Sequence, residues 1–462
     1  MTEFRKTKLI PTACALMLAA LFPSAMRSQQ APASQAQMPS LQLPAAQAPV
    51  GPAASSGPRL TLAEAERMAI EHNPNISVAR LIALAQAQVM REVRSGELPT
   101  ATGSLTAVGA HENSRVTAGL LNNPSIFDRA AGGLTVSQLI TDFGRSHNLV
   151  RSAQSNAKAQ LENERATELD ITLTVDQAFY QALTAQAVLK VAEETVNQRQ
   201  ATVDQVGALT KAKLRSDLDL SFANVQISQA KLLLLDAQNS AADAMASLNT
   251  VLGSERDEQY TLVDETTANP EPAPQDADAL LQSTFAARPD LAALNLSYTA
   301  ARQFSTAERE LWMPTVSALA AVGGTPVRAD QIQSSWYGAA GANISIPIFN
   351  GFLYNARAQE AKLRANAAGE QVRNLRQEIA RDFRIAVLNA QNAFQRIGVT
   401  QEMMNESNMA LDLSQARYKI GLSGIVELTQ AQLAQTQAEI AYTNARYAYQ
   451  TALAVVRFQT GQ

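Results

Sequence analysis

An internal duplication constrains the fold of this chain more than any other feature. Two proline dipeptides recur at one constant offset (289 − 74 and 314 − 99, both 215), as Asn73-Pro74 with Arg288-Pro289 and Leu98-Pro99 with Met313-Pro314. Further along, the offset falls to 208 (460 − 252 and 427 − 219), between Leu252-Gly253 and Thr460-Gly461 and between Asp219 and Glu427. The second copy is therefore seven residues shorter, and the missing residues correspond to a loop between Pro99 and Asp142 of the first copy. We therefore expect two related units, each helical and interrupted once by a strand hairpin.

The composition favours long, closely packed helices over several ordinary domains. Aromatic residues make up only 5% of the 462 residues, whereas a compact enzyme core of this size uses more large side chains. Alanine- and glutamine-rich sequence suits helices that lie side by side. The formal net charge of −4 gives no reason to expect a nucleic-acid partner.

Residues 1–25 are typical of an export signal. Arg5, Lys6 and Lys8 precede an apolar run, Leu9–Phe22, that is too short to span a bilayer as a helix. The single cysteine, Cys14, lies in this run, and Pro11 stands where a lipoprotein signal needs an aliphatic residue. We expect Cys14 to leave with the signal; its lipidation is the alternative. Residues 26–59 are rich in proline, glutamine and alanine and predict a disordered leader.

Two repeats are expected after this leader, at 60–268 and 276–462, with a proline-rich linker at 269–275. Thr61 and Glu64 form a capping-box pattern before the first helix, and Pro74 starts a second helix that ends near Glu97. A helix pair follows the strands, from about Gly144 to Leu209 and from about Ser216 to Leu252. The second repeat predicts helices over about 276–287, 289–311, 353–419 and 425–459, with turns near 211–216 and 421–424.

Between these helices the residue pattern changes to a period of two, which indicates strands. Ala101, Gly103, Leu105 and Ala107 alternate with hydroxyl residues and match Val316, Ala318, Ala320 and Val322 of the second copy, where Thr315 and Ser317 match Thr100 and Thr102. Leu134 and Val136 likewise match Ala342 and Ile344. Each copy thus predicts two strands with one apolar and one hydroxyl-rich face. An exposed hairpin in a soluble helical protein is the alternative.

Four strands of this length fit a membrane span but cannot close. An open sheet edge in lipid leaves backbone groups unpaired, at a cost of several kcal/mol each, and the smallest barrels need about eight strands. The long helices also need neighbours, because an isolated hairpin buries little core. A cyclic oligomer satisfies both needs, although these arguments leave the number of subunits open.

The layout resembles the TolC-like outer-membrane efflux proteins over residues 60–462. The motifs that carry the resemblance are Leu62-Ala63-Glu64-Ala65, Asn73-Pro74, Leu98-Pro99, Thr141-Asp142-Phe143-Gly144-Arg145, Ile348-Phe349-Asn350-Gly351, Tyr418-Lys419-Ile420-Gly421, Ile425-Val426-Glu427-Leu428 and Asn444-Ala445-Arg446-Tyr447. The resemblance implies a mainly α fold with a small β part: long helical hairpins forming an α-barrel, and four strands contributed to a 12-stranded membrane β-barrel of a homotrimer. It implies an outer-membrane location with an extension into the periplasm.

The same resemblance implies a passive export duct of a tripartite efflux or type I secretion system. Its partners would be a periplasmic adaptor protein and an inner-membrane pump of the RND, ABC or MFS type. The rival hypothesis is a periplasmic helical-hairpin scaffold or adaptor without membrane insertion. That class carries β domains on both sides of a single hairpin, which this chain lacks.

The resemblance also implies a gate at the periplasmic tip. Glu427 falls on its main acidic position and Gln430 on a second position that is acidic in other members. Asp219 and Tyr418 match residues that hold the tip shut, and the arginine of that latch falls on Ser423. Arg417 or Lys419 could replace it. A structural role is the alternative: Glu427 suits a first helical turn, and Ser216 with Asp219 forms a capping box.

We find no pattern of an enzyme, a cofactor site or a metal site. His72, His111 and His147 have no ligand spacing, and Gly132-Gly133 and Gly323-Gly324 lack the lysine of a phosphate loop. These glycines suit strands or turns. Trp336 and Tyr337 begin a strand and suit either an interfacial aromatic girdle or a turn contact.

Overall fold

The computed structural model describes residues 57–109, 128–254, 256, 258–266, 270, 272–274, 276–327 and 334–461. The predicted signal with Cys14, nearly all of the predicted leader and His111 lie outside the described residues. The first copy contains α1 (Leu62–His72), α2 (Pro74–Ser95), β2 (Thr100–Val108), β3 (Arg129–Thr141), α3 (Arg145–Lys211) and α4 (Asp217–Leu252). The second contains α5 (Ala277–Ala287), α6 (Pro289–Arg309), the short 3-10 helix η1 (Glu310–Trp312), β5 (Thr315–Val327), β6 (Trp336–Ser345), α7 (Leu353–Lys419) and α8 (Ile425–Gln459).

The two long helices are of equal length and begin in the same way. Both α3 and α7 have 67 residues, which corresponds to about 100 Å. Phe143 and Gly144 precede α3, and Gly351 and Phe352 precede α7; all four have positive φ angles, of 59°, 109°, 63° and 67°. Two successive left-handed residues thus turn the chain from strand into helix in each copy, and phenylalanine carries a conformation that glycine adopts more readily.

The proline corner of the first copy is fixed by Asn73. Its Oδ1 accepts a hydrogen bond from the Asn75 backbone N–H (2.9 Å), which caps α2, and its Nδ2 donates to the Val251 carbonyl oxygen (3.0 Å) near the end of α4. Gly253 ends α4 with φ 80°, and a Cβ there would lie 2.8 Å from the His72 carbonyl oxygen. The corner and the last helix of the copy are therefore held together.

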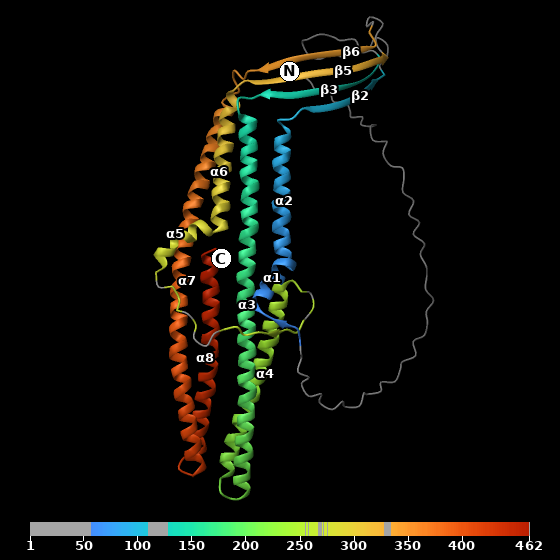
Figure 1. The fold of residues 1–462 in the computed structure, drawn as a ribbon. Helices are drawn as coiled ribbons and strands as arrows, with labels where there is room; N and C mark the ends of the chain where they lie inside the picture. Colours follow the sequence, from blue (N-terminus) through green and yellow to red (C-terminus); the bar gives the residue numbers. More distant parts are fainter. Residues whose placement is uncertain are drawn as a thin grey trace, which may run out of the picture. The chain divides into compact units, whose positions relative to one another are not determined.

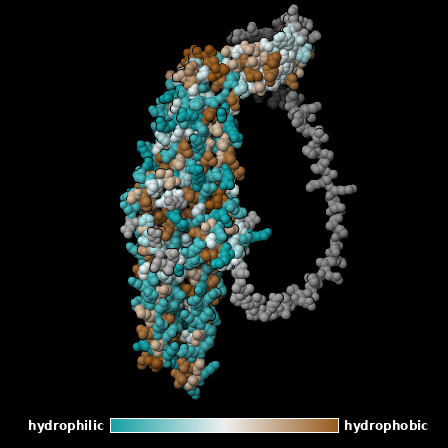
Figure 2. All heavy atoms as spheres, viewed as in Figure 1, coloured by the Kyte–Doolittle hydropathy of each residue, from teal (hydrophilic) through white to brown (hydrophobic). Residues whose placement is uncertain are grey.

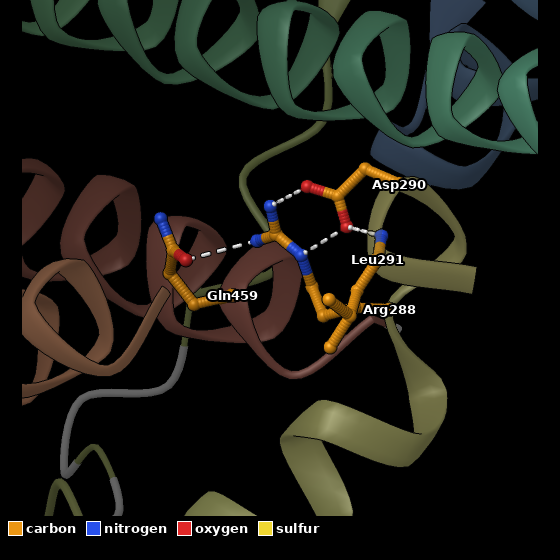
Figure 3. Close-up of polar contacts among 4 residues, drawn as sticks. All are labelled: Arg288, Asp290, Leu291 and Gln459. Atoms are coloured by element: carbon orange, nitrogen blue, oxygen red, sulfur yellow. Dashed lines mark hydrogen bonds and ion pairs between the residues drawn. The ribbon is translucent and has the colours of Figure 1, made fainter. Parts of the chain in front are cut away.

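Arg288 fixes the corresponding corner of the second copy by different chemistry (Figure 3). Its Nη1 donates to Gln459 Oε1 (2.9 Å) near the end of α8, and its Nε donates to Asp290 Oδ1 (3.0 Å). Gln459 and Val251 occupy equivalent positions of the two copies, and Gly461, with φ 76°, lies against Ala287 as Gly253 lies against His72. In each copy, the Asn-Pro or Arg-Pro motif thus contacts the glycine motif at the end of the last helix, and this contact is repeated in the second copy.

The strands form one antiparallel sheet in the order β2-β3-β5-β6 (Figure 1). Directly paired residues share a face, and the register pairs Ala101 with Val136, Val136 with Ala320, and Ala320 with Ala340. On the other face, Thr102 pairs with Thr135 and Ser317 with Asn343. The predicted apolar face is therefore confirmed, whereas the predicted hydroxyl-rich face holds in β2 and β3 but continues in β5 with Leu319 and Ala321. The sheet's β2 and β6 are edge strands, each paired on one side only among the described residues.

The paired glycines lie at the centre of this sheet. Gly133 is opposite Gly323, and Gly132 is opposite Gly324. The Tyr337 side chain covers Gly133 and Gly323, leaving no room for a Cβ at either position. The expectation that these glycines lie in strands is confirmed, and Trp336 and Tyr337 do begin β6.

The helices pack as two hairpins, α3 with α4 and α7 with α8, with α6 between α3 and α7 (Figure 1). Their buried residues are rich in alanine, including Ala65, Ala69, Ala192, Ala307 and Ala390. Small side chains let helix backbones approach closely, so the compositional prediction of side-by-side helices is confirmed. Among the described residues, none of the helices has an apolar stretch long enough to cross a bilayer.

A second, two-stranded sheet was not predicted from the sequence. β1 (Arg59–Leu60) pairs in parallel with β4 (Thr261–Leu262), so Arg59, which was expected to lie in the disordered leader, is part of a sheet. Part of the expected linker is also packed: Ala273 is buried, and Gln391 Nε2 donates to the Pro274 carbonyl oxygen (2.8 Å). The predicted end of α6 at Leu311 is replaced by η1, and β5 extends beyond Val322, the last residue of its predicted apolar face, to Val327.

Candidate functional site at the paired helical turns

The turns that join α3 to α4 and α7 to α8 share one backbone geometry. Leu214 N–H donates to the Leu209 carbonyl and Leu422 N–H to the Arg417 carbonyl, both at 2.9 Å. This bond spans five residues and closes the end of each helix in a Schellman arrangement. Lys213 (φ 59°) and Gly421 (φ 78°) occupy the left-handed position, at equivalent places in the two copies. The first turn thus places lysine where the second has glycine.

The two turns meet through Arg215 and Tyr418. The Arg215 Nη2 donates to the Tyr418 carbonyl oxygen (2.9 Å), and its guanidinium carbon lies 4.4 Å from the centroid of the Tyr418 ring. An apolar cluster surrounds this contact and joins all four long helices: Val206, Ala223, Leu411, Tyr418, Ile425 and Leu428. The hairpin ends therefore have a small core of their own, capped by a cation–π contact.

Tyr418 is buried at 2% exposure, and its Oη has no hydrogen-bond partner among the described residues. Burial raises the pKa of Tyr418, the Arg215 cation lowers it, and the Asp219 charge raises it. Asp219 does not bond to Tyr418 within the described protomer. Its Oδ2 accepts from the Ser216 backbone N–H (3.4 Å), and its own backbone N–H donates to Ser216 Oγ (3.2 Å). The capping box expected from the sequence is thus present.

Glu427 lies in the first turn of α8, as expected, and pairs with Arg417. The Arg417 Nε donates to Glu427 Oε1 at 2.9 Å across the α7–α8 turn, and both side chains are about half exposed. Arg417 was one of the two cations considered for the latch, and its partner in the protomer is the acidic residue itself. Each copy of the chain therefore brings one ion pair, not one isolated carboxylate, to this end of the helices.

The remaining predicted residues differ in exposure. Gln430 is exposed on α8. Ser423 is buried at 8% exposure, and its Oγ has no partner among the described residues. Arg215 was not predicted as a site residue. Its partner Tyr418 lies in the other copy, far away along the chain, and no sequence motif relates the two positions.

Within the described part of the chain, no group of three His, Cys, Asp or Glu side chains could hold a metal ion. His72 Nδ1 lies 3.0 Å from the Met68 carbonyl oxygen, one helical turn away, and His147 is exposed. The arrangement at the turns offers charge and a closable contact between helices. Among the described residues there, it brings together no nucleophile with a base.

Comparison with known proteins agrees with this architecture. A family model described as "Outer membrane efflux protein" matches residues 66–254 and 280–462. The chain is 25% identical over 303 residues to the fusaric acid resistance protein FusA of Burkholderia cepacia, covering 62% of this chain and 55% of FusA. It is 24% identical over 311 residues to the cation efflux system protein CusC of Escherichia coli K12, covering 65% and 66%.

Solved structures share the fold. A crystal structure of CusC superposes with a TM-score of 0.75 at 21% identity, covering 87% of this chain and 92% of that one. The CmeC outer membrane channel of Campylobacter jejuni gives a TM-score of 0.75 at 18% identity, covering 87% and 85%. The mainly helical, duplicated fold class is thereby confirmed.

This chain is an outer membrane protein with the fold of an efflux channel. It belongs to the outer membrane efflux protein family, whose model covers both copies of the duplication. The matched region spans only 55% of FusA and 66% of CusC.

Proposed function

We propose that this chain is one subunit of a homotrimeric channel in the outer membrane. The channel is a passive duct that extends into the periplasm and is gated at the paired turns. It works in a tripartite efflux or type I secretion system, with a periplasmic adaptor and an inner-membrane pump. FusA is named for fusaric acid resistance and CusC for cation efflux, which supports export as the activity.

The observation that carries this proposal is the incomplete sheet. Its edges, β2 and β6, each have a free side among the described residues, and its apolar face exposes Leu105 at 93% and Ile344 at 62%. In lipid, unpaired edge groups cost several kcal/mol each. Three copies pooled edge to edge give twelve strands and remove every edge.

The helices support the same conclusion. Large apolar side chains on α4 and α7 are more than half exposed in the protomer, among them Leu232, Leu235, Leu363, Leu388 and Val399. Figure 2 shows apolar residues distributed along the helices and gathered where they meet the sheet. Packing against a further surface would bury these side chains. Neighbouring copies of the same hairpins provide it in a closed ring.

The gate is assigned to the ring of turns around the channel axis. Three copies of the Arg417–Glu427 pair place three carboxylates and three guanidinium groups at the constriction. The negative charge of Glu427 favours cations in the pore, and the positive charge of Arg417 offsets much of this effect. Asp219, Tyr418, Gln430 and Ser423 are assigned to the same constriction, where Tyr418 Oη and Ser423 Oγ still lack partners among the described residues of one protomer.

Conductance in planar lipid bilayers tests this function. The purified full-length protein is expected to form channels, and Glu427→Gln is expected to shift the reversal potential in a KCl gradient toward anions, because Arg417 is left unpaired. Glu406→Gln, an exposed carboxylate of α7 remote from the turns, is the matched control. A wild-type protein that forms no channels would overturn the proposal, and an unchanged reversal potential for Glu427→Gln would remove Glu427 from the constriction.

A further inference from the structure

Two grooves flank the contact between α6 and α7, and their charges differ. The first is charge-balanced: Arg357 and Arg364 face Glu308 and Glu360, and Arg364 Nη2 lies 2.6 Å from Glu360 Oε1. The second groove has a volume of about 520 Å³ and no carboxylate among its described lining residues. Its charged residues are Arg302, Arg309 and Lys362, all cations.

These three cations are not neutralised within the described part of the protomer. None of them forms an ion pair with a described residue, and Arg302 makes only a cation–π contact, at 5.8 Å, with Tyr298 of its own helix. Like charges that line one groove repel each other. A bound anion removes that repulsion. The balanced groove on the other side of the same helices needs no such ligand.

The lining of the second groove suits a phosphate group. Two arginines from α6 and a lysine from α7 approach from both sides, and arginine binds phosphate oxygens through two parallel N–H bonds. Neutral donors, including Asn355, Gln359 and Asn366 from α7, surround them. Several charge-assisted bonds to one group with three or four oxygens are therefore available. A single carboxylate would satisfy fewer of these donors.

One end of the groove is aromatic. Trp312 lines the groove, is 37% exposed and packs edge-on against Tyr354 with ring centroids 5.6 Å apart. It lies three residues before Thr315, the first residue of β5. An indole next to cations is the arrangement found where a protein meets the headgroup layer of a membrane. The site is thus open to the phosphate of a lipid as well as to a soluble phosphate.

We propose that the groove lined by Arg302, Arg309, Lys362 and Trp312 binds a phosphate group, carried either by a phospholipid headgroup or by a soluble phosphate. This site on the α6–α7 pair is separate from the paired turns, and ligand binding to it requires neither the gate nor conductance.

Binding to the full-length protein in neutral detergent tests this proposal. Short-chain phosphatidylglycerol and inorganic phosphate are titrated separately, and bound ligand is counted by native mass spectrometry. The double variant Arg309→Gln/Lys362→Gln is expected to bind at least about tenfold more weakly, a loss of about 1.4 kcal/mol, and Arg302→Gln to weaken binding in the same direction. Arg364→Gln, whose arginine belongs to the balanced groove on the same helix, is the control and is expected to bind as the wild type does.

Comparing the two ligands distinguishes a site for a phospholipid headgroup from a site for soluble phosphate. Binding of phosphatidylglycerol alone, lost in the double variant, supports a lipid site; binding of both ligands, lost together, supports a site for soluble phosphate. Binding of neither ligand by the wild type would overturn the proposal. Binding that the double variant retains, or that Arg364→Gln loses equally, would overturn it as well.

Discussion

Arg215 in the α3–α4 turn holds Tyr418 at the end of α7 by two contacts, a hydrogen bond of 2.9 Å to its carbonyl oxygen and a cation–π contact of 4.4 Å to its ring. This pair links the two hairpins at their free ends. Arg215 thus adds two polar contacts to the apolar cluster at the hairpin ends. Loss of these contacts is expected to weaken the link between the two hairpins.

Replacing Arg215 by alanine is expected to loosen the hairpin ends. The lost cation–π contact and charged hydrogen bond are worth about 1 to 2 kcal/mol, so amide exchange in peptides that cover residues 417–428 is expected to rise at least about fivefold. Hydrogen-exchange mass spectrometry measures this directly. Lys211→Ala, an exposed cation of the same turn, is the control. Unchanged exchange in Arg215→Ala would show that the apolar cluster alone holds the ends together.

Replacing Arg417 by glutamine is expected to act in the direction opposite to Glu427→Gln. The substitution leaves the Glu427 carboxylate without its 2.9 Å partner, so the channel is expected to become more cation-selective. The reversal potential in a KCl gradient reports the change. Lys419→Gln, a cation that has no ion pair in the described structure, is the matched control. An equal shift in both variants would mean that net charge near the turns matters and the specific pair does not.

Local features of the fold could be predicted from the sequence, whereas the contacts between the two turns could not. The apolar strand face and the capping boxes at Thr61 and Ser216 are local patterns, and the duplication appears as repeated dipeptides; the structure agrees with all three. Arg215 and Tyr418, and likewise β1 and β4, meet across the length of a whole copy of the duplication. A two-residue strand such as Arg59–Leu60 carries no periodic signal, because its pairing depends on the packing of α1 against α3. Such contacts follow only from the assembled tertiary structure.

Asp176 makes the stability of the helical core dependent on pH. Burial raises its pKa to about 7, assisted by Glu66 and opposed by Arg457, whose Nη2 lies 3.3 Å away. Tyr180 faces the same groups, and its pKa is raised mainly by burial. Because the folded pKa of Asp176 exceeds the unfolded value of 3.8, its contribution to stability is complete below about pH 4 and is lost as the pH rises through about 7.

The variant Asp176→Asn is therefore expected to gain stability relative to the wild type between pH 4 and pH 8, by a few degrees in Tm. Thermal unfolding in detergent at several pH values measures the difference. Asp236→Asn, an exposed carboxylate on α4, is expected to show no such trend. A constant difference between wild type and Asp176→Asn would mean that Asp176 stays ionised throughout this range.

Arg199 is a buried cation without a partner among the described residues. It is 3% exposed, forms no hydrogen bond or ion pair with any of them, and desolvation lowers its pKa to about 10. Replacing a buried, uncompensated charge by an apolar side chain of similar length removes its desolvation cost. We expect Arg199→Met to stabilise the protein by about 1 to 3 kcal/mol, seen as a raised Tm.

Arg165→Met on the same helix is the control for Arg199→Met, because Arg165 is exposed and makes only a surface pair with Glu162. It is expected to change Tm little. A lowered Tm in Arg199→Met would show that the guanidinium has a partner in the assembled protein, such as a group from a neighbouring subunit.

The mass of the protein extracted intact from outer membranes shows whether three copies close the sheet. The sheet has two open edges among the described residues, β2 and β6, which neighbouring copies are expected to complete. Native mass spectrometry of the detergent-solubilised protein is predicted to give a single species of three times the protomer mass. A stable monomer, recovered from a fraction other than the outer membrane, would show that the sheet is not completed by neighbouring copies in a membrane barrel.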